Sequence, residues 1–267
     1  MTTSYHEPVL TAHVLDLLQV APGKKYIDGT YGGGGHTRAI RKRGGIVLGI
    51  DADPDAGAIL GNFRDIETIA QENGFEAVDG ILLDLGVSSH QLDTASRGFS
   101  YRFVSSRLDL RFNQKSGETA AQLVNRVSEE ELYEIFSSFG EEERARAIAH
   151  AIVRARFVKP IATVGDIVGI VGAQNASLSR IFQALRIAIN DEFGALKEGI
   201  IGANRLLVPG GRLAVISFHS LEDRIVKRMM AGSGWSVVNR KPITARALEV
   251  YKNKRSRSAK LRVAIKV

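Results

Sequence analysis

A run of four consecutive glycines directly after a short β-prone segment constrains this chain more than any other feature. Residues 25–27 form a short β-prone run that suits a strand and ends at Asp28, and a glycine-rich turn over residues 29–35 follows at once. Glycine adopts positive φ and lets the backbone approach a ligand, and the helix expected from His36 to Arg43 offers free N–H groups at its start. The pattern predicts a cofactor loop at the end of a buried strand.

The spacing of these glycines indicates which cofactor the loop binds. The dinucleotide pattern G-x-G-x-x-G is not matched, because Thr37 or Arg38 stands where its last glycine should be. An acid at the strand end followed by Gly32 and Gly34 suits S-adenosylmethionine better. Asp51 ends the next strand, 23 residues after Asp28, where a carboxylate accepts hydrogen bonds from ribose hydroxyls.

Three continuous apolar runs predict the fold. Residues 46–50 and 81–83 are uninterrupted by polar side chains, and residues 212–216 are apolar after Arg212, as strands buried on both faces of a parallel sheet should be. Each run is followed by a polar loop, which is typical of a doubly wound, Rossmann-like α/β sheet. The alternating run over residues 261–267 suggests an edge strand.

Helical periodicity replaces the strand pattern from about residue 119 to residue 207. We expect an all-helical insertion over residues 108–177, within a methyltransferase-type domain made of residues 1–107 and 178–267. Two sequential domains are the alternative. A long last helix is predicted to return to the sheet with a single apolar stripe made of Phe182, Leu185, Ile189, Phe193, Leu196 and Ile200.

Composition narrows the class of protein. The chain of 267 residues has no cysteine, which excludes disulfides and thiolate metal sites, and it has no apolar run long enough to cross a bilayer. With no signal peptide visible either, we expect a soluble cytoplasmic protein without a membrane partner. The net charge of +7 favours a polyanionic partner, and six cations without an acid occupy residues 252–262.

Several motifs, taken in order along the chain, resemble one known family. They are His6-Glu7-Pro8-Val9-Leu10, Tyr26-Ile27-Asp28-Gly29-Thr30 with its glycine loop and His36, Asp84-Leu85-Gly86-Val87-Ser88-Ser89, Arg97-Gly98-Phe99-Ser100, and Ser217-Phe218-His219-Ser220-Leu221-Glu222-Asp223-Arg224. Together they resemble the bacterial ribosomal RNA small-subunit methyltransferase H family, also called MraW.

The resemblance implies S-adenosylmethionine-dependent methylation of the exocyclic N4 of one cytidine in the decoding region of small-subunit rRNA. It also implies that the helical insertion recognises the RNA. The cofactor residues implied by matching motifs are Gly34, Gly35, His36, Asp51, Phe63, Asp84 and Gln91. Only eleven residues separate Asp51 from Phe63, too few for the additional helix and strand that members of the family usually have there.

The chemistry of the acceptor suggests catalytic and substrate residues. Because the lone pair of cytosine N4 is delocalised into the ring, an acceptor must orient the amine and stabilise the charge that develops on it. Asp84, or a backbone carbonyl in the loop from Leu85 to Ser88, could do this. Phe99 could stack on the cytosine or simply pack beneath its loop.

Three further polar residues are candidates for substrate binding. Arg186 and Asn190, four residues apart on the side of the last helix opposite the stripe, could line a groove. His219 follows a predicted strand, and the adjacent Ser220 with Asp223 could instead serve as a helix cap. No histidine spacing indicates a metal site.

Small-subunit rRNA within an assembled or nearly assembled subunit is the expected partner, and a homodimer is possible. An RNA-binding protein that keeps the fold without catalysis is the first alternative. A nucleotide-dependent oxidoreductase is the second, and the glycine spacing disfavours it.

Overall fold

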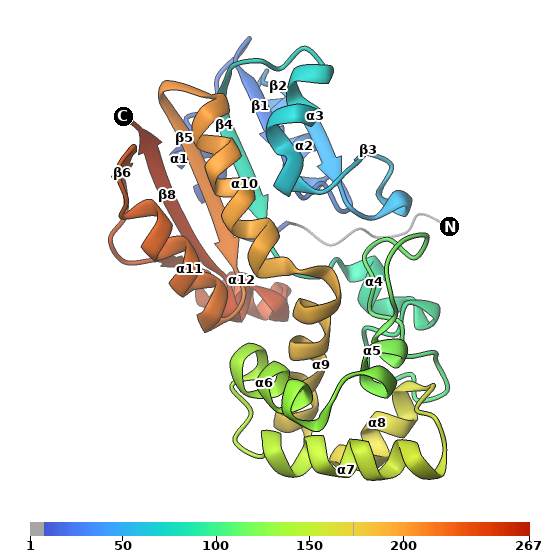
Figure 1. The fold of residues 1–267 in the computed structure, drawn as a ribbon. Coiled ribbons are helices and arrows are strands. Elements are labelled where there is room, and N and C mark those ends of the chain that lie inside the picture. Colours follow the sequence, from blue (N-terminus) through green and yellow to red (C-terminus); the bar gives the residue numbers. More distant parts are fainter. Residues whose placement is uncertain (1–7, 173) are drawn as a thin grey trace. The chain divides into compact units, whose positions relative to one another are not determined.

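The computed structural model describes residues 8–172 and 174–267, and Figure 1 labels most of its helices and strands. The His6-Glu7 part of the first motif therefore lies outside the described residues. The chain divides into two compact units, which we call the sheet unit (up to Gly86 and from Phe193 to Val267) and the helical unit (Val87–Glu192).

The sheet unit alternates strands and helices along the chain. Its first part contains α1 (Thr11–Leu17), β1 (Lys25–Asp28), α2 (Gly35–Lys42), β2 (Ile46–Asp51), η1 (Pro54–Ala56), β3 (Ile59–Leu60), η2 (Phe63–Asp65), α3 (Ile66–Glu72) and β4 (Val78–Asp84). Its second part contains most of α10 (Glu192–Leu206), then β5 (Leu207–Ser217), α11 (Ser220–Met230), β6 (Trp235–Val237), β7 (Ile243–Thr244), α12 (Ala247–Lys252), η4 (Lys254–Ser258) and β8 (Lys260–Lys266).

One eight-stranded sheet has the order β3-β2-β1-β4-β5-β8-β6, with β7 paired to β8. Strands β1 to β5 are parallel, and β8 runs antiparallel to β5. The order reverses between β1 and β4, and in doubly wound folds ligands bind outside the carboxyl ends of the strands at such a switch point. The predicted Rossmann-like fold class is confirmed.

Alternate side chains of the strands enter two cores on opposite faces of the sheet. On one face Ile81, Leu83 and Val215 pack with residues of α3, α10 and α11. On the other, Leu82 and Ile216 pack with residues of α1 and α2. Both faces are buried, which is why these strands read as continuous apolar runs in the sequence.

The prediction that residues 261–267 form an edge strand is wrong. Strand β8 lies inside the sheet, because Leu213 on β5 pairs with Ala264 on one side and Val237 on β6 pairs with Ala264 on the other. The outer strand β6 has only three residues and is mostly exposed, so no apolar pattern indicated it.

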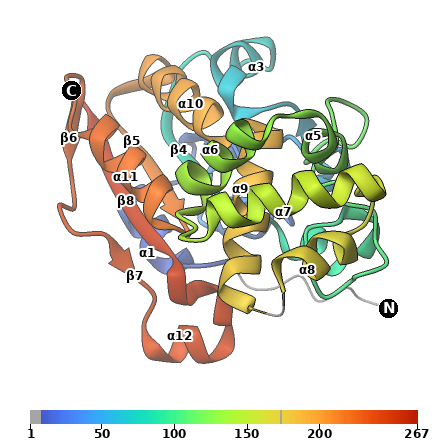
Figure 2. The same ribbon diagram turned by 60° about the horizontal axis from the view of Figure 1, so that its bottom comes forward.

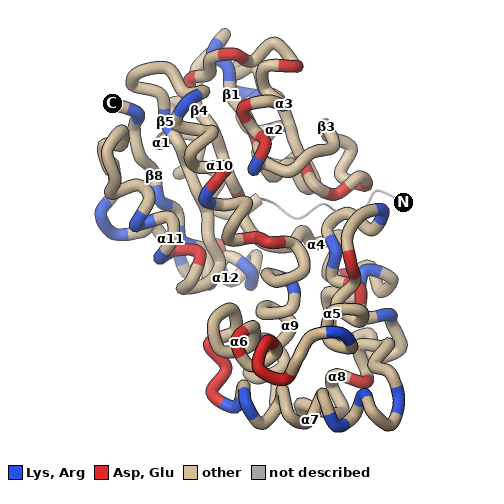
Figure 3. The backbone as a smooth tube through the Cα atoms, viewed as in Figure 1, with Lys and Arg blue, Asp and Glu red and all other residues tan. Residues whose placement is uncertain are grey.

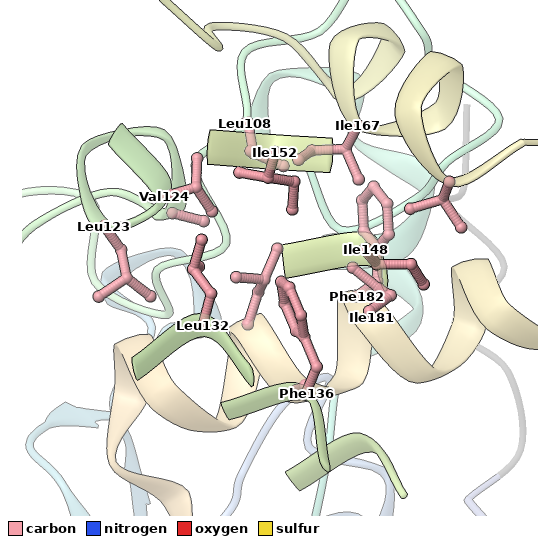
Figure 4. Packing of buried hydrophobic residues seen from close by; sticks show 14 of the residues in the cluster. Leu108, Leu123, Val124, Leu132, Phe136, Ile148, Ile152, Ile167, Ile181 and Phe182 are labelled. Atoms are coloured by element: carbon pink, nitrogen blue, oxygen red, sulfur yellow. The ribbon is translucent and has the colours of Figure 1, made fainter. Parts of the chain in front are cut away.

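The helical unit contains α4 (Ser89–Asp93), η3 (Ala95–Arg97), α5 (Ala120–Arg126), α6 (Glu129–Gly140), α7 (Ala145–Val158), α8 (Val164–Val171) and α9 (Asn175–Asn190). Its core is separate from those of the sheet unit, and Figure 4 shows Leu132, Phe136, Ile148 and Ile152 of neighbouring helices pointing into it. It is wider at both ends than the insertion expected over residues 108–177. Phe99 on one side, and Ile181 and Leu185 on the other, belong to the same core.

The single long helix expected from the apolar stripe is two helices. Asp191, between α9 and α10, has φ of 45° and ends α9 in the left-handed region. Phe182 and Leu185 pack in the helical unit, whereas Leu196 and Ile200 pack in the sheet unit. The apolar residues of the stripe have the same helical spacing in both helices, although the two helices pack in different cores. Periodicity alone therefore did not show that the helix ends at Asp191.

Lysine and arginine positions are interspersed with acidic ones along both units (Figure 3). Among the described residues, no helix is both long and apolar enough to cross a membrane.

Candidate active site at the carboxyl ends of the parallel strands

Three aspartates end three neighbouring strands of the sheet unit. Asp28 ends β1, Asp51 ends β2 and Asp84 ends β4, and β1 lies between the other two strands. Since parallel strands have their carboxyl ends at one edge of the sheet, the topology brings the three carboxylates to the same edge.

Asp28 is the buried centre of a hydrogen-bond network. Its Oδ2 accepts a hydrogen bond from Thr37 Oγ1 at 2.7 Å, and its Oδ1 accepts one from the Thr30 backbone N–H at 3.4 Å. The Thr30 hydroxyl oxygen in turn accepts from the backbone N–H of Asp84 at 2.6 Å. The network joins the ends of β1 and β4 to the start of α2, so Asp28 is placed to hold the loop rather than to face a ligand.

Sequence reasoning missed both threonines of this network. Thr30 and Thr37 stand on either side of the four glycines, and hydroxyl side chains next to a loop are typical partners of its backbone. Burial raises the pKa of the Asp28 carboxyl, and the charge of nearby His36 opposes this rise.

Two glycines of the loop make room for side chains of this chain. Gly34 has φ of 69°, and a Cβ there would lie 2.6 Å from the Tyr31 ring. A Cβ on Gly35 would lie 2.9 Å from the Pro8 side chain. Glycine is therefore favoured at position 34 by its positive φ and at position 35 by packing against Pro8, whether or not a ligand lies against the loop.

Asp51 holds the glycine loop from the neighbouring strand. Its Oδ2 accepts from the backbone N–H of Gly32 at 2.6 Å, and its Oδ1 accepts from that of Asp53 at 2.8 Å. Burial raises the pKa of Asp51 to about 6, although both backbone hydrogen bonds oppose the rise. Each carboxylate oxygen can accept a second hydrogen bond, so the pair can still receive two vicinal hydroxyls.

His36, in the first turn of α2, is buried beside Asp84. Its Nε2 lies 3.5 Å from Asp84 Oδ2. Neither ring nitrogen, nor the buried Asp84 Oδ1, has a hydrogen-bond partner among the described residues. Burial alone would lower the pKa of His36, but the carboxylates of Asp84 and Asp28 outweigh it and raise that pKa.

Phe63 lies in η2, after the short connection from Asp51. That connection is filled by one 3-10 turn, η1, and by the two-residue strand β3, which pairs with β2 through Ile50 and Ile59. The Phe63 side chain packs against two glycines, since a Cβ on Gly29 or on Gly199 would lie 3.3 or 2.6 Å from it.

Ser88 and Gln91 form a capping box at the start of α4 in the helical unit. Ser88 Oγ accepts from the Gln91 backbone N–H at 3.2 Å, and Gln91 Oε1 accepts from the Ser88 backbone N–H at 2.9 Å. Such a box satisfies two backbone donors at a helix start. The catalytic role considered for Ser88 and the cofactor contact implied for Gln91 stay predictions.

The candidate substrate residues of the helical unit contact other residues of the same unit. Phe99 is buried and its ring stacks on Phe112 with 5.8 Å between centroids, which accounts for an aromatic residue there without a bound base. Arg186 donates to both carboxylate oxygens of Glu192, at 2.7 and 3.0 Å.

Asn190 joins α9 to the loop around Leu110 through hydrogen bonds. Its Oδ1 accepts from the Phe112 N–H at 2.8 Å, and its Nδ2 donates to the carbonyls of Leu110 and Arg186 at 2.8 and 2.9 Å. These bonds account for asparagine at this position by structure alone.

His219 caps helix α11 in the sheet unit. Its Nδ1 accepts from the Glu222 backbone N–H at 3.3 Å, and Glu222 Oε2 accepts from the His219 N–H at 3.3 Å. The helix cap therefore lies one residue earlier than the cap expected from Ser220 and Asp223. The sequence did not indicate it, because histidine is not among the usual capping residues. Asp223 instead accepts two hydrogen bonds from Arg262.

The structure thus places Gly34, Gly35, His36, Asp51, Phe63, Asp84 and His219 in the sheet unit, and Ser88, Gln91, Phe99, Arg186 and Asn190 in the helical unit. Within residues 8–172 and 174–267, no group of three or more histidine or acidic side chains could hold a metal ion.

The sequence profile of the MraW methylase family matches residues 3–267. The chain belongs to the MraW methylase family. Its members are S-adenosylmethionine-dependent methyltransferases, so the family and the cofactor expected from the sequence are both confirmed.

Relatives with similar sequences carry one name. Ribosomal RNA small subunit methyltransferase H of Deinococcus radiodurans is 48% identical over 281 residues, which cover 98% of this chain and 89% of that protein. The protein of the same name from Heliobacterium mobile is 43% identical over 310 residues, covering 98% and 99% of the two chains. The alignment of 310 residues is longer than the 267 residues of this chain, so it contains positions at which this chain has no residue.

Solved structures are only distantly similar. An rRNA methylase from Streptococcus thermophilus has 11% identity and a TM-score of 0.45, with 96% of this chain and 95% of that chain covered. This likeness adds nothing to the fold assignment, which rests on the strand order.

The donor set at the strand ends fits S-adenosylmethionine. Asp51 offers carboxylate oxygens to hydroxyls, and Asp84 has a buried carboxylate oxygen without a hydrogen-bond partner among residues 8–172 and 174–267. The glycine loop between β1 and α2 brings backbone to the same edge.

Proposed function

We propose that this member of the MraW family methylates the exocyclic N4 of one cytidine in the decoding region of bacterial small-subunit rRNA. The observation that carries the proposal is Asp84, whose Oδ1 is buried at the end of β4 without a hydrogen-bond partner in the described residues. An unsatisfied buried carboxylate oxygen is costly, and an amine that donates to it would remove that cost. The name of the relatives supports small-subunit rRNA as the substrate.

Asp51 and the glycine loop are the proposed holders of the cofactor. The two oxygens of Asp51 would accept the ribose hydroxyls, while the Gly32 and Asp53 backbone N–H groups fix the orientation of the carboxylate. Phe63, Gly34, Gly35 and His36 complete the cofactor residues proposed in the sheet unit. When bound, S-adenosylmethionine supplies an electrophilic methyl group on a positively charged sulfur.

Asp84 is the proposed catalytic residue. Its Oδ1 would accept a hydrogen bond from the N4 amine, which would orient the nitrogen lone pair and stabilise the positive charge that develops as the nitrogen–carbon bond forms and the methyl–sulfur bond breaks. The same oxygen then takes the proton that the amine loses. His36 Nε2 lies 3.5 Å from Asp84 Oδ2 and would help to orient the carboxylate.

The expected substrate form is rRNA within an assembled or nearly assembled subunit, which would place the protein with ribosomes in the cytoplasm. Incubating the protein with free rRNA and with purified subunits would distinguish the two forms by the rate of methyl incorporation. Whether the active form is a homodimer stays a prediction for sedimentation analysis.

Mass spectrometry of small-subunit rRNA nucleosides from cells with and without the gene tests the proposed function. We expect N4-methylated cytidine to be lost in the deletion strain, and to return with the wild-type gene but not with a gene encoding Asp84→Ala. Unchanged nucleosides in the deletion strain would favour the alternative of an RNA-binding protein without catalysis.

A further inference from the structure

Helix α12 exposes two large apolar side chains next to a basic segment. Tyr251 is 85% exposed and Leu248 is 68% exposed, although most large apolar residues of the chain are buried. They lie three positions apart on a helix, so both side chains lie on one face. No described segment of this unit covers that face. Along the chain α12 follows β7 and precedes β8, and Figure 2 shows it at one end of the sheet unit.

The basic residues around this face are also exposed. Arg246, Lys252, Lys254 and Arg257 are exposed, whereas Arg262, further along the same basic run, is buried and paired with Asp223. The run that looked uniform in the sequence is therefore divided. The cations from Lys252 to Arg257 follow Tyr251 in α12 and η4, whereas Lys260 and Arg262 lie in strand β8.

The acid within this segment is turned toward the protein. Glu249 Oε1 accepts a hydrogen bond from the Leu10 backbone N–H at 2.6 Å. Residues two apart on a helix point to nearly opposite sides, so this bond directs Tyr251 outward. No acidic side chain is exposed between Arg246 and Ser258.

The segment after α12 is folded rather than a loose tail. Asn253 Oδ1 accepts from the Arg255 N–H at 3.1 Å, and the Ser256 hydroxyl donates to the Asn253 carbonyl at 2.7 Å. Ser256 is fully buried. The cations of η4 are therefore presented on a fixed backbone beside α12.

We propose that α12 and η4 form a docking platform for single-stranded RNA, with Tyr251 stacking on an unpaired base and Lys252, Lys254 and Arg257 pairing with the flanking phosphates. An exposed aromatic ring among cations matches how proteins hold unpaired nucleic acid, since every base has a face for stacking. Two apolar side chains on a six-residue helix give too small an apolar face for a membrane-surface helix. The inference rests on the proposed function only in taking RNA as the partner.

Binding of a fluorescein-labelled, unstructured RNA of about twelve nucleotides to the full chain, measured without cofactor, tests the platform. We expect Tyr251→Ala to weaken binding about tenfold and Tyr251→Phe to change it less than about twofold, because stacking needs the ring and not the hydroxyl. The double variant Lys252→Ala/Lys254→Ala should lower the slope of log affinity against log salt by about 1.4, as two lost phosphate contacts on a single strand would.

The matched control is Lys227→Ala/Arg228→Ala, which removes two exposed cations from α11 of the same unit. It should leave the slope unchanged. Equal losses of slope in the two double variants, or equal affinity of Tyr251→Ala and wild type, would overturn the proposal. So would equally strong competition by a duplex RNA of the same length, or Tyr251-dependent binding of phosphatidylglycerol vesicles in place of RNA.

These outcomes are separable from the proposed function. Tyr251-dependent RNA binding without methylation of any rRNA would support the platform and contradict the activity. Methylation with Tyr251-independent RNA binding would do the reverse. Circular dichroism and S-adenosylmethionine affinity, both expected to equal wild type, show that each variant is folded.

Discussion

The two units treat their conspicuous polar residues differently. In the sheet unit, Asp51 and Asp84 keep oxygens that can accept further hydrogen bonds at the strand ends. In the helical unit, Ser88 and Asn190 are engaged in hydrogen bonds to backbone groups, at a helix start and between α9 and a loop. A polar residue in a motif therefore indicates a ligand only where the fold leaves its hydrogen-bonding groups unused. Substitutions in the sheet unit should change function, and those in the helical unit should first change stability.

Asp84→Asn should have the largest effect. Replacing the carboxylate removes the proton acceptor and puts an amide where the charge is needed, so we expect the single-turnover rate at saturating cofactor to fall at least about 100-fold. Glu198→Gln serves as the control. It changes an exposed carboxylate on α10 of the same unit and should leave the rate unchanged. A rate within about fivefold of wild type for Asp84→Asn would remove Asp84 from catalysis.

Asp51→Ala should weaken S-adenosylmethionine binding by about 1–3 kcal/mol, because two ribose hydroxyls lose their acceptors. Isothermal titration calorimetry measures this directly. Unchanged affinity would contradict the proposed role of Asp51. Asp51 would then have only a structural role, like the polar motif residues of the helical unit.

The pH dependence of the same binding reaction follows from the raised pKa of Asp51, about 6. Ribose hydroxyls donate to the charged carboxylate, so binding requires the proton to leave. Affinity should be nearly constant above pH 7 and should fall as the pH decreases through about 6, by up to tenfold per unit. The Asp51→Asn variant, which does not titrate, should lose this dependence, and a slope shared by variant and wild type would assign it to another group.

Asn190→Ala should lower the free energy of unfolding by about 2–3 kcal/mol, since the Phe112 N–H and the Leu110 carbonyl both lose their partner. Chemical denaturation followed by circular dichroism measures the change. Cofactor affinity at a temperature where the variant is folded should equal wild type. An unchanged free energy of unfolding together with impaired RNA methylation would instead support Asn190 as a substrate-binding residue.

Gln91→Ala should have the smallest effect, about 1 kcal/mol of unfolding free energy, from loss of half of the capping box. Thermal unfolding of the variant beside Gln91→Glu, which keeps an oxygen for the Ser88 N–H, distinguishes the cap from other roles. Equal destabilisation by both substitutions would show that the cap is not what Gln91 contributes.

The sequence predicted the sheet well because strands buried on both faces are continuous apolar runs, as in β2 and β4. It predicted the carboxylates at the strand ends for the same reason, since each follows such a run directly. It could not show that Asp191 breaks the long helix, because apolar spacing is the same for one core or for two. Neither could it show that Asn190 binds Leu110 and Phe112, because those partners lie about eighty positions away in the chain.

The most direct test of the central claim uses small subunits purified from a strain that lacks the gene. They are incubated with the protein and labelled S-adenosylmethionine, and the label is mapped to a nucleotide and to an atom within it. We predict a label on N4 of one cytidine in the decoding region with the wild-type protein, and none with Asp84→Ala. A label on another base or another atom, or none from a protein that binds the cofactor, would contradict the account.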